Sequence, residues 1–214
     1  LPVLTSAIEK KDTQKIISLT WKGFELLFGS GLAIAIFGFA YTPEIVRIIS
    51  TPDFLTTTVL GYSSIDAMRI VIWIFLFYFI SSLSTYIMIA RWEQSRMMWI
   101  NGIVAVINII GNLIFIPHYS FFASAMVTLL SQILLMSITW WYIRDTIHIR
   151  RSLHFVLSMS MISFIAIWLS YYFVNIFLYS NMSLLNSITR VIIAGIIFGI
   201  IYLGWWWQIR KRIL

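Results

Sequence analysis

The stretch that decides the fold is NIIGNLIFIPHYSFFASAMVTLLSQ, residues 108–132, which consists of two apolar runs joined by a short turn. Polar side chains recur on both sides of the turn at helical spacing. Residues three, four or seven positions apart share one face of a helix, so the stretch predicts two antiparallel helices whose polar stripes face each other. The polar residues concerned are Asn108, Asn112, Ser124, Thr128 and Gln132.

The rest of the chain has the composition of a polytopic membrane protein. Of its 214 residues, 60% are hydrophobic and only 11% are charged, whereas a soluble domain carries about a quarter charged residues. A transmembrane helix needs about 20 mostly apolar residues, and six segments qualify. They are residues 18–40, 69–90, 97–117, 120–143, 155–179 and 190–207. The sequence therefore predicts an all-α protein with six transmembrane helices.

The positive charge of the chain predicts its orientation in the membrane. Most of the 15 lysines and arginines fall on one side of the six segments: Lys10, Lys11, Lys15, Lys22, Arg91, Arg96, Arg144, Arg150, Arg151, Arg210, Lys211 and Arg212. Cytoplasmic loops of membrane proteins carry such an excess. We therefore expect a multi-pass protein of the cell (inner) membrane with both ends of this chain in the cytoplasm. The net charge of +7 then lies in these loops and does not indicate a nucleic-acid partner.

No pattern typical of a cofactor, metal or catalytic site is found. The chain has no cysteine, and His118 and His154 lack partners at metal-ligand spacing. The motifs of phosphate-binding loops, zinc proteases and serine hydrolases are also missing. The sequence therefore predicts a protein without a cofactor or metal that is not an enzyme.

Two interpretations of the polar stripe at 108–132 stay open. The side chains can hydrogen-bond across a packed helix interface, at about 0.6 kcal/mol per bond, and each residue taken alone fits this role. They can also line a hydrated path, which five aligned polar positions favour because amides are costly in lipid. The hydroxyls of Ser81, Ser82 and Ser84 are expected to bond to their own backbone or to a neighbouring helix.

Lys22 and Glu25 are the second polar feature within an apolar segment. Their i, i+3 spacing allows an ion pair on one helix. If the helix begins near Ile16, Glu25 lies about 13 Å along its axis, where a charge is costly. The pair either reaches the cytoplasmic headgroups or faces a cavity close to an anionic substrate.

LPVLTS at residues 1–6 and the stretch 108–132 resemble a known family. They are similar to the C-terminal part of the polysaccharide-biosynthesis membrane proteins, the oligosaccharide flippases of the multidrug/oligosaccharidyl-lipid/polysaccharide exporter superfamily. Pro2 and the basic EKKDTQK that follows match one part of the family pattern, and the others in register are Asn108, Asn112, Ile116, Pro117, Tyr119 and Thr128. Two glycines of the pattern are replaced, by Ser120 and Ala123. The resemblance covers about residues 1–143.

The resemblance implies a transporter of two lobes and about fourteen helices. Residues 1–143 would belong to the C-terminal lobe, and residues 144–214 would form an additional transmembrane hairpin. The first helices would be missing, as the start at Leu1 also leads us to expect. Such proteins move undecaprenyl-pyrophosphate-linked oligosaccharide from the cytoplasmic to the outer leaflet by alternating access. The substrate-path candidates are Lys22, Glu25, Asn108, Asn112, Thr128 and Gln132. The expected partners are the lipid-linked oligosaccharide, membrane lipids and the missing helices.

Two alternatives to the flippase remain. A cation-coupled multidrug exporter of the same superfamily needs a carboxylate within the membrane, and Glu25 is the candidate. A membrane glycosyltransferase or polymerase usually carries acids or arginines in long outer loops. The longest outer loop here has only Glu44, Arg47 and Asp53, which makes this alternative the weaker one.

Overall fold

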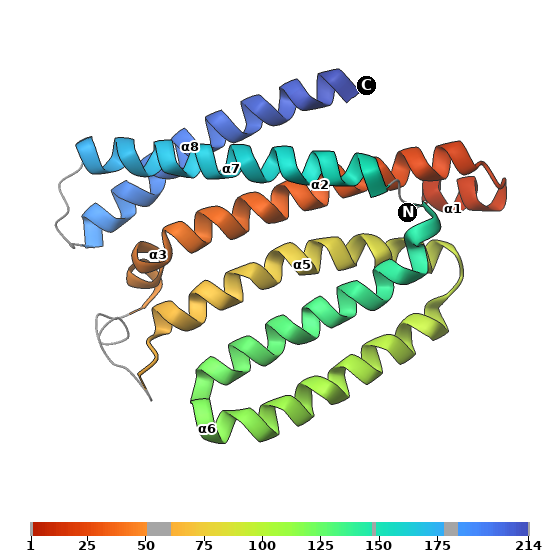
Figure 1. Cartoon of the computed structure of the whole chain (residues 1–214), viewed down its shortest axis with the longest axis horizontal. Helices are drawn as coiled ribbons and strands as arrows, with labels where there is room; N and C mark the ends of the chain where they lie inside the picture. Colours follow the sequence, from red (N-terminus) through yellow and green to blue (C-terminus); the bar gives the residue numbers. More distant parts are fainter. Residues whose placement is uncertain (1, 51–60, 147–148, 178–183, 214) are drawn as a thin grey trace.

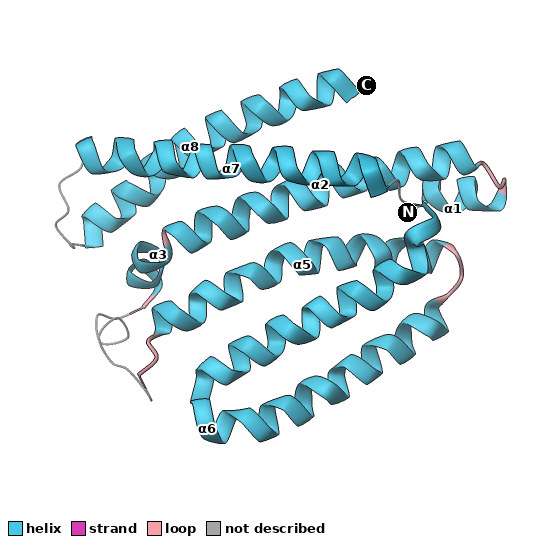
Figure 2. Ribbon diagram, in the orientation of Figure 1, coloured by secondary structure: helices cyan, strands magenta, loops and turns pink. Residues whose placement is uncertain are grey.

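The structure is a computed structural model that describes residues 2–50, 61–146, 149–177 and 184–213. Within these residues the chain is helical and contains no strand (Figure 2). The helices are α1 (Pro2–Glu9), α2 (Thr13–Ala40), α3 (Thr42–Ile49), α5 (Ser64–Ala90), α6 (Gln94–Ile143), the 3-10 turn η1 (Arg144–Thr146), α7 (Ile149–Phe177) and α8 (Leu184–Ile213).

Five of these helices, α2, α5, α6, α7 and α8, are long and apolar enough to cross a membrane. The six predicted segments fall on five helices because the third and fourth both lie in α6, whose 50 residues fold back on themselves. The change of direction is at Ser120, which has non-helical backbone angles and follows Pro117. We call residues 94–119 the first arm of α6 and residues 121–143 its second arm. Residues 178–179, at the end of the predicted fifth segment, lie outside the described residues.

Local sequence explains where the helices begin. Ser63 and Asp66 form a reciprocal cap at the start of α5: the Asp66 N–H donates to Ser63 Oγ at 3.3 Å, and the Ser63 N–H donates to Asp66 Oδ2 at 2.9 Å. Such a box satisfies backbone donors that the first turn leaves open. Asp12 caps α2 in a similar way by accepting from the Lys15 N–H at 3.0 Å.

The long helices lie side by side in an open layer (Figure 1). The first arm of α6 packs on the second arm, the second arm on α5, α5 on α2, and α2 on α7, which pairs with α8. The central helix α2 approaches α5 closely because glycines face it. A Cβ on Gly38 would meet Ile72 Cγ1 at 2.5 Å, and one on Gly31 would meet Leu76 Cα at 3.2 Å.

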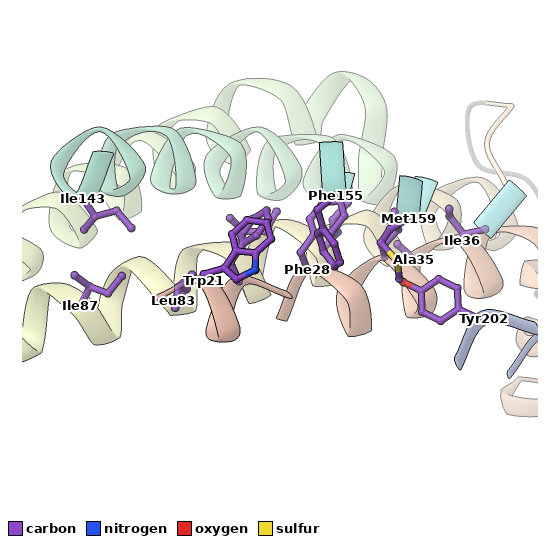
Figure 3. Close-up of a cluster of buried hydrophobic side chains, with 14 of the residues drawn as sticks. Trp21, Phe28, Ala35, Ile36, Leu83, Ile87, Ile143, Phe155, Met159 and Tyr202 are labelled. Atoms are coloured by element: carbon purple, nitrogen blue, oxygen red, sulfur yellow. The ribbon is translucent and has the colours of Figure 1, made fainter. Parts of the chain in front are cut away.

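An aromatic core surrounds the middle of α2 (Figure 3). Phe24 and Phe28 stack with ring centroids 5.4 Å apart, and Phe155 of α7 meets the edge of Trp21 at 5.7 Å. The buried Tyr202 hydroxyl of α8 donates to the Gly29 carbonyl at 2.7 Å. By contrast, the first arm of α6 exposes apolar side chains over most of its surface, as a helix at the edge of a layer in lipid does.

The connections gather at two opposite ends of the layer (Figure 1). One end holds α1, the turn between α5 and α6, and η1, and there Arg91 pairs with Asp145 at 2.8 Å. The other end holds α3 and the turn at Ser120. The sequence predicts that the loop between the second and third segments and the loop between the fourth and fifth segments are cytoplasmic. In the structure, these two loops lie at the same end of the layer.

Candidate functional site

The two arms of α6 meet through their polar side chains. Asn108 Nδ2 donates to Ser131 Oγ at 3.0 Å. A side chain as short as serine can reach the opposite arm only if the helices lie close together, and Gly111 permits this. A Cβ at Gly111 would lie 2.9 Å from Val127 Cγ1. The predicted antiparallel pairing of the two halves of the stretch is therefore present.

Asn112 lies one helical turn beyond Asn108 and extends the contact. Its Nδ2 donates to Asn108 Oδ1 at 2.9 Å and to the Asn108 carbonyl at 3.0 Å. Its own Oδ1 is buried and accepts no hydrogen bond from the residues that the structure describes. Leaving such a group without a partner costs about 1–3 kcal/mol. Asn112 therefore holds an acceptor that is available to another donor.

Gln132 carries the polar contact from α6 to α5. Its Nε2 donates to Ser81 Oγ at 2.7 Å, and Ser81 Oγ donates to the Tyr78 carbonyl at 3.0 Å. Successive helical residues point about 100° apart, which is why Ser131 faces the first arm while Gln132 faces α5. We call Ser81, Asn108, Asn112, Ser131 and Gln132 the polar seam. It connects three consecutive helical rods of the layer.

Thr128 lies one turn before Ser131 on the second arm. It is half-buried, and its hydroxyl makes no side-chain hydrogen bond to the described residues. Thr128 is thus close in sequence to the seam, and its hydroxyl is a second uncommitted polar group, on the arm opposite to Asn112.

Lys22 and Glu25 lie elsewhere in the layer. Both belong to α2, which α5 and the second arm of α6 separate from the first arm (Figure 1). Lys22 is exposed, whereas Glu25 is 7% exposed among the residues around the aromatic core. Lys22 takes part in none of the ion pairs among the described residues. The structure therefore does not bring these two candidates together with Asn108, Asn112, Thr128 and Gln132.

An apolar groove of about 610 Å³ lies between α2 and α7, away from the seam. Its walls carry almost no polar surface, and it is lined by Ala40, Phe164, Ile165, Ile167, Trp168 and Tyr171. Such a surface suits hydrocarbon chains and offers nothing to a sugar hydroxyl.

The chemistry of the seam is that of neutral hydrogen bonding. Amides and hydroxyls can exchange bonds with hydroxyl-rich molecules, but they cannot transfer protons near neutral pH. Across the described ranges, no three histidine, aspartate or glutamate side chains form a group that would hold a metal ion. The arrangement therefore fits binding or passage of a polar molecule better than acid–base chemistry.

The sequence predicted that Ser131 lies on the polar face of the second arm and that Ser81 bonds to its own backbone or to a neighbouring helix, but it did not assign a partner to either serine. Serines are common in membrane helices and usually bond to their own backbone, as Ser82 does with the Tyr78 carbonyl at 2.8 Å. Only the rotation of each helix about its axis shows which serine faces an amide. Ser131 lies seven positions after Ser124 of the predicted stripe. That spacing was the indication in the sequence that Ser131 faces the first arm.

Comparisons of the chain with profiles of known protein families, with curated proteins and with solved structures find no match. The functional interpretation depends on the polar groups described above.

Proposed function

We propose that this chain is part of a membrane transporter that moves lipid-linked oligosaccharide, of the undecaprenyl-pyrophosphate type, from the cytoplasmic to the outer leaflet. The chain would cross the membrane six times, with each arm of α6 making one crossing, and would pack against the helices of a second lobe. Alternating access would open and close a path along the polar seam. The likeness of the stretch 108–132 to oligosaccharide flippases supports this proposal, and so does the position of the seam inside apolar helices.

The observation that carries the proposal is the buried, unpartnered Oδ1 of Asn112. A seam that served packing alone would gain by satisfying this acceptor, since burying it unbonded costs free energy. A sugar hydroxyl can donate to it. When the arms separate, the amide of Asn108 would exchange Ser131 for a hydroxyl of the sugar at little net cost. When the second arm moves away from α5, the amide of Gln132 would exchange Ser81 for another.

Charge movement would favour export in the same direction. An anion that leaves an inside-negative cell gains about 2.3 kcal/mol per charge per 100 mV. Lys22 is exposed in the N-terminal half of α2, the half that we assign to the cytoplasmic side, where it can meet a pyrophosphate group entering from the inner leaflet. The membrane potential would then contribute to export without a nucleotide.

The proposal is tested by glycan export in cells that depend on the full-length transporter. Asn112→Leu removes the free acceptor and is expected to lower export about tenfold at equal protein level, which is the effect of losing one hydrogen bond of about 1.4 kcal/mol. Asn101→Leu is the matched control, because Asn101 lies on the same arm, is exposed, and bonds only to the Met97 carbonyl of its own helix. Wild-type export by the Asn112→Leu protein would contradict the proposal.

A second candidate, the cation-coupled multidrug exporter, is favoured by the buried carboxyl group of Glu25. Carboxylates inside membrane helices are often the groups that carry a coupling proton or cation. This candidate predicts that activity depends on Glu25 and not on Asn112. Glu25→Gln would abolish proton- or sodium-driven efflux of a cationic dye, and Asn112→Leu would leave efflux unchanged.

A further inference from the structure

A buried charge cluster lies at the end of the layer opposite to η1. Arg190 of α8 pairs with Glu44 of α3, with 3.5 Å between Nε and Oε1, and its Nη2 donates to Asn175 Oδ1 of α7 at 2.8 Å. The side chains of Arg190 and Glu44 are only 10% and 14% exposed. The short helix α3 and the two consecutive helices α7 and α8, which are distant from α3 in sequence, therefore converge on one guanidinium group.

A hydrogen-bond chain beside this cluster joins α2 to the same pair of helices. Ser170 Oγ of α7 donates to the Ala194 carbonyl of α8 at 3.1 Å, and it lies 3.2 Å from the Tyr41 hydroxyl. Since the single Ser170 proton is used toward Ala194, Tyr41 is the donor to Ser170. Tyr41 is fully buried and is the residue between α2 and α3.

Two features indicate that the charge pair specifies a position more than it adds stability. A buried ion pair loses hydration energy that its attraction only partly offsets, so a well-packed apolar pair would often be as stable. Arg190 Nη1 is moreover buried and has no hydrogen-bond partner among the described residues. The pairing does, however, allow only one seating of α8 against α3, because any other would bury an unpaired charge.

The short helix α3 occupies a connecting position. It packs on α8 and also on α5, across the end of α2 (Figure 1). In the described residues α5 and α8 make no contact with each other. At this end of the layer, α3 therefore adds to α2 a second connection between the α7–α8 pair and the α5–α6 side.

We propose that Arg190, Glu44 and Asn175 form a charge latch, in which α3 holds the α7–α8 hairpin against the rest of the layer at one defined position. The latch is independent of what the protein transports. Its opening frees the hairpin at this end while the Tyr202 contact with Gly29 still holds α8 to α2.

The test uses a single cysteine as a reporter, because the chain has no cysteine of its own. Ser187→Cys places a thiol of similar size three residues before Arg190, at a position 2% exposed near the start of α8. The rate of its reaction with a water-soluble maleimide is measured on the full chain in detergent micelles. Glu44→Gln and Arg190→Met are each expected to raise this rate about a hundredfold, because each leaves one buried charge unpaired. The exchange Glu44→Arg with Arg190→Glu is expected to restore most of the protection.

Two controls separate the latch from general destabilisation. Arg96→Gln breaks an ion pair that is shorter, at 2.9 Å, but lies at the surface, and it should not change the labelling of Ser187→Cys. Ser84→Cys reports on α5, where Ser84 is fully buried and its hydroxyl bonds to none of the described residues, and it should stay protected in the Glu44→Gln protein. An unchanged labelling rate at Ser187→Cys would overturn the proposal, and so would an equal rise at both reporters.

Discussion

At the scale of single residues, Ser120 has an unfavourable backbone conformation. Its φ of 52° and ψ of −142° lie where side chains clash with the backbone and glycine does not. The chain reverses direction at Ser120, between the two arms of α6. The backbone strain arises because this reversal takes place within a few residues. Glycine is the residue that the flippase pattern places after Tyr119, and the structure supplies a physical reason for it.

We therefore expect Ser120→Gly to stabilise the protein. The free energy of unfolding in mixed micelles should rise by about 1 kcal/mol, because the substitution relieves the left-handed strain and the added chain entropy offsets only part of the gain. Ser124→Gly is the control, since Ser124 has ordinary helical angles, and it should lower stability by about 0.5–1 kcal/mol. A Ser120→Gly protein less stable than the wild type would show that the turn is not strained.

The polar seam shows which side-chain contacts can be predicted from residue spacing and which cannot. The spacing of Asn108, Asn112 and Gln132 predicted polar groups on facing stripes, and two of the three amides do bond across helix boundaries. That Gln132 turns to Ser81 of α5 was not predictable, because hydropathy does not record how α5 is rotated. Lys22 and Glu25 show the same limit. Their spacing allowed an ion pair, but α2 is covered on several sides, and one residue is buried while the other is exposed.

At the scale of elements, α2 depends on glycine for its contact with α5. Gly31→Ala would place a Cβ 2.8 Å from Phe79 Cδ2 and 3.2 Å from the backbone at Leu76. The ring can rotate but the backbone cannot move without shifting α5. We expect a loss of about 1–3 kcal/mol in the free energy of unfolding, the range found for overpacked cores.

Gly199→Ala on α8 is the matched control for this prediction. Among the described residues, no atom outside the neighbouring backbone of α8 lies within 4 Å of a Cβ at Gly199, so the same substitution should raise stability by about 0.5–1 kcal/mol through helix propensity alone. Equal effects at the two positions would mean that helix propensity, and not the α2–α5 contact, determines the result.

The lengths and positions of the long helices were largely predictable from the sequence, whereas the contacts between helices were less predictable. Apolar length located all five long helices. Arg190 and Glu44 are different. The sequence assigned Glu44 to the longest outer loop, and nothing in the local sequence of Glu44 or Arg190 indicates a partner 146 positions away. Only packing of α3 on α8 brings them together.

At the scale of the whole molecule, the two ends of the layer predict its topology. Lys10 directly follows α1, which lies at the end with η1, and His118 directly precedes the turn of α6, which lies at the end with α3 (Figure 1); both residues are exposed. In intact cells a membrane-impermeant maleimide should label His118→Cys within the full-length protein, because this end faces outward in our assignment. Lys10→Cys should be labelled only after the membrane is permeabilised. Labelling of both, or of Lys10→Cys alone, would contradict the orientation inferred from the basic loops.

The reversal of α6 at Ser120 also has a consequence for synthesis of the protein. If each arm of α6 crosses the membrane once, as we propose, the few residues that join the arms require both arms to insert together as one hairpin of about 50 residues. Asn108 would then enter lipid already bonded to Ser131, so its amide need never face hydrocarbon alone. A flexible insert at the Ser120 turn would allow the two arms to insert separately. Asn108 of the first arm would then enter the bilayer without its hydrogen-bond partner on the second arm.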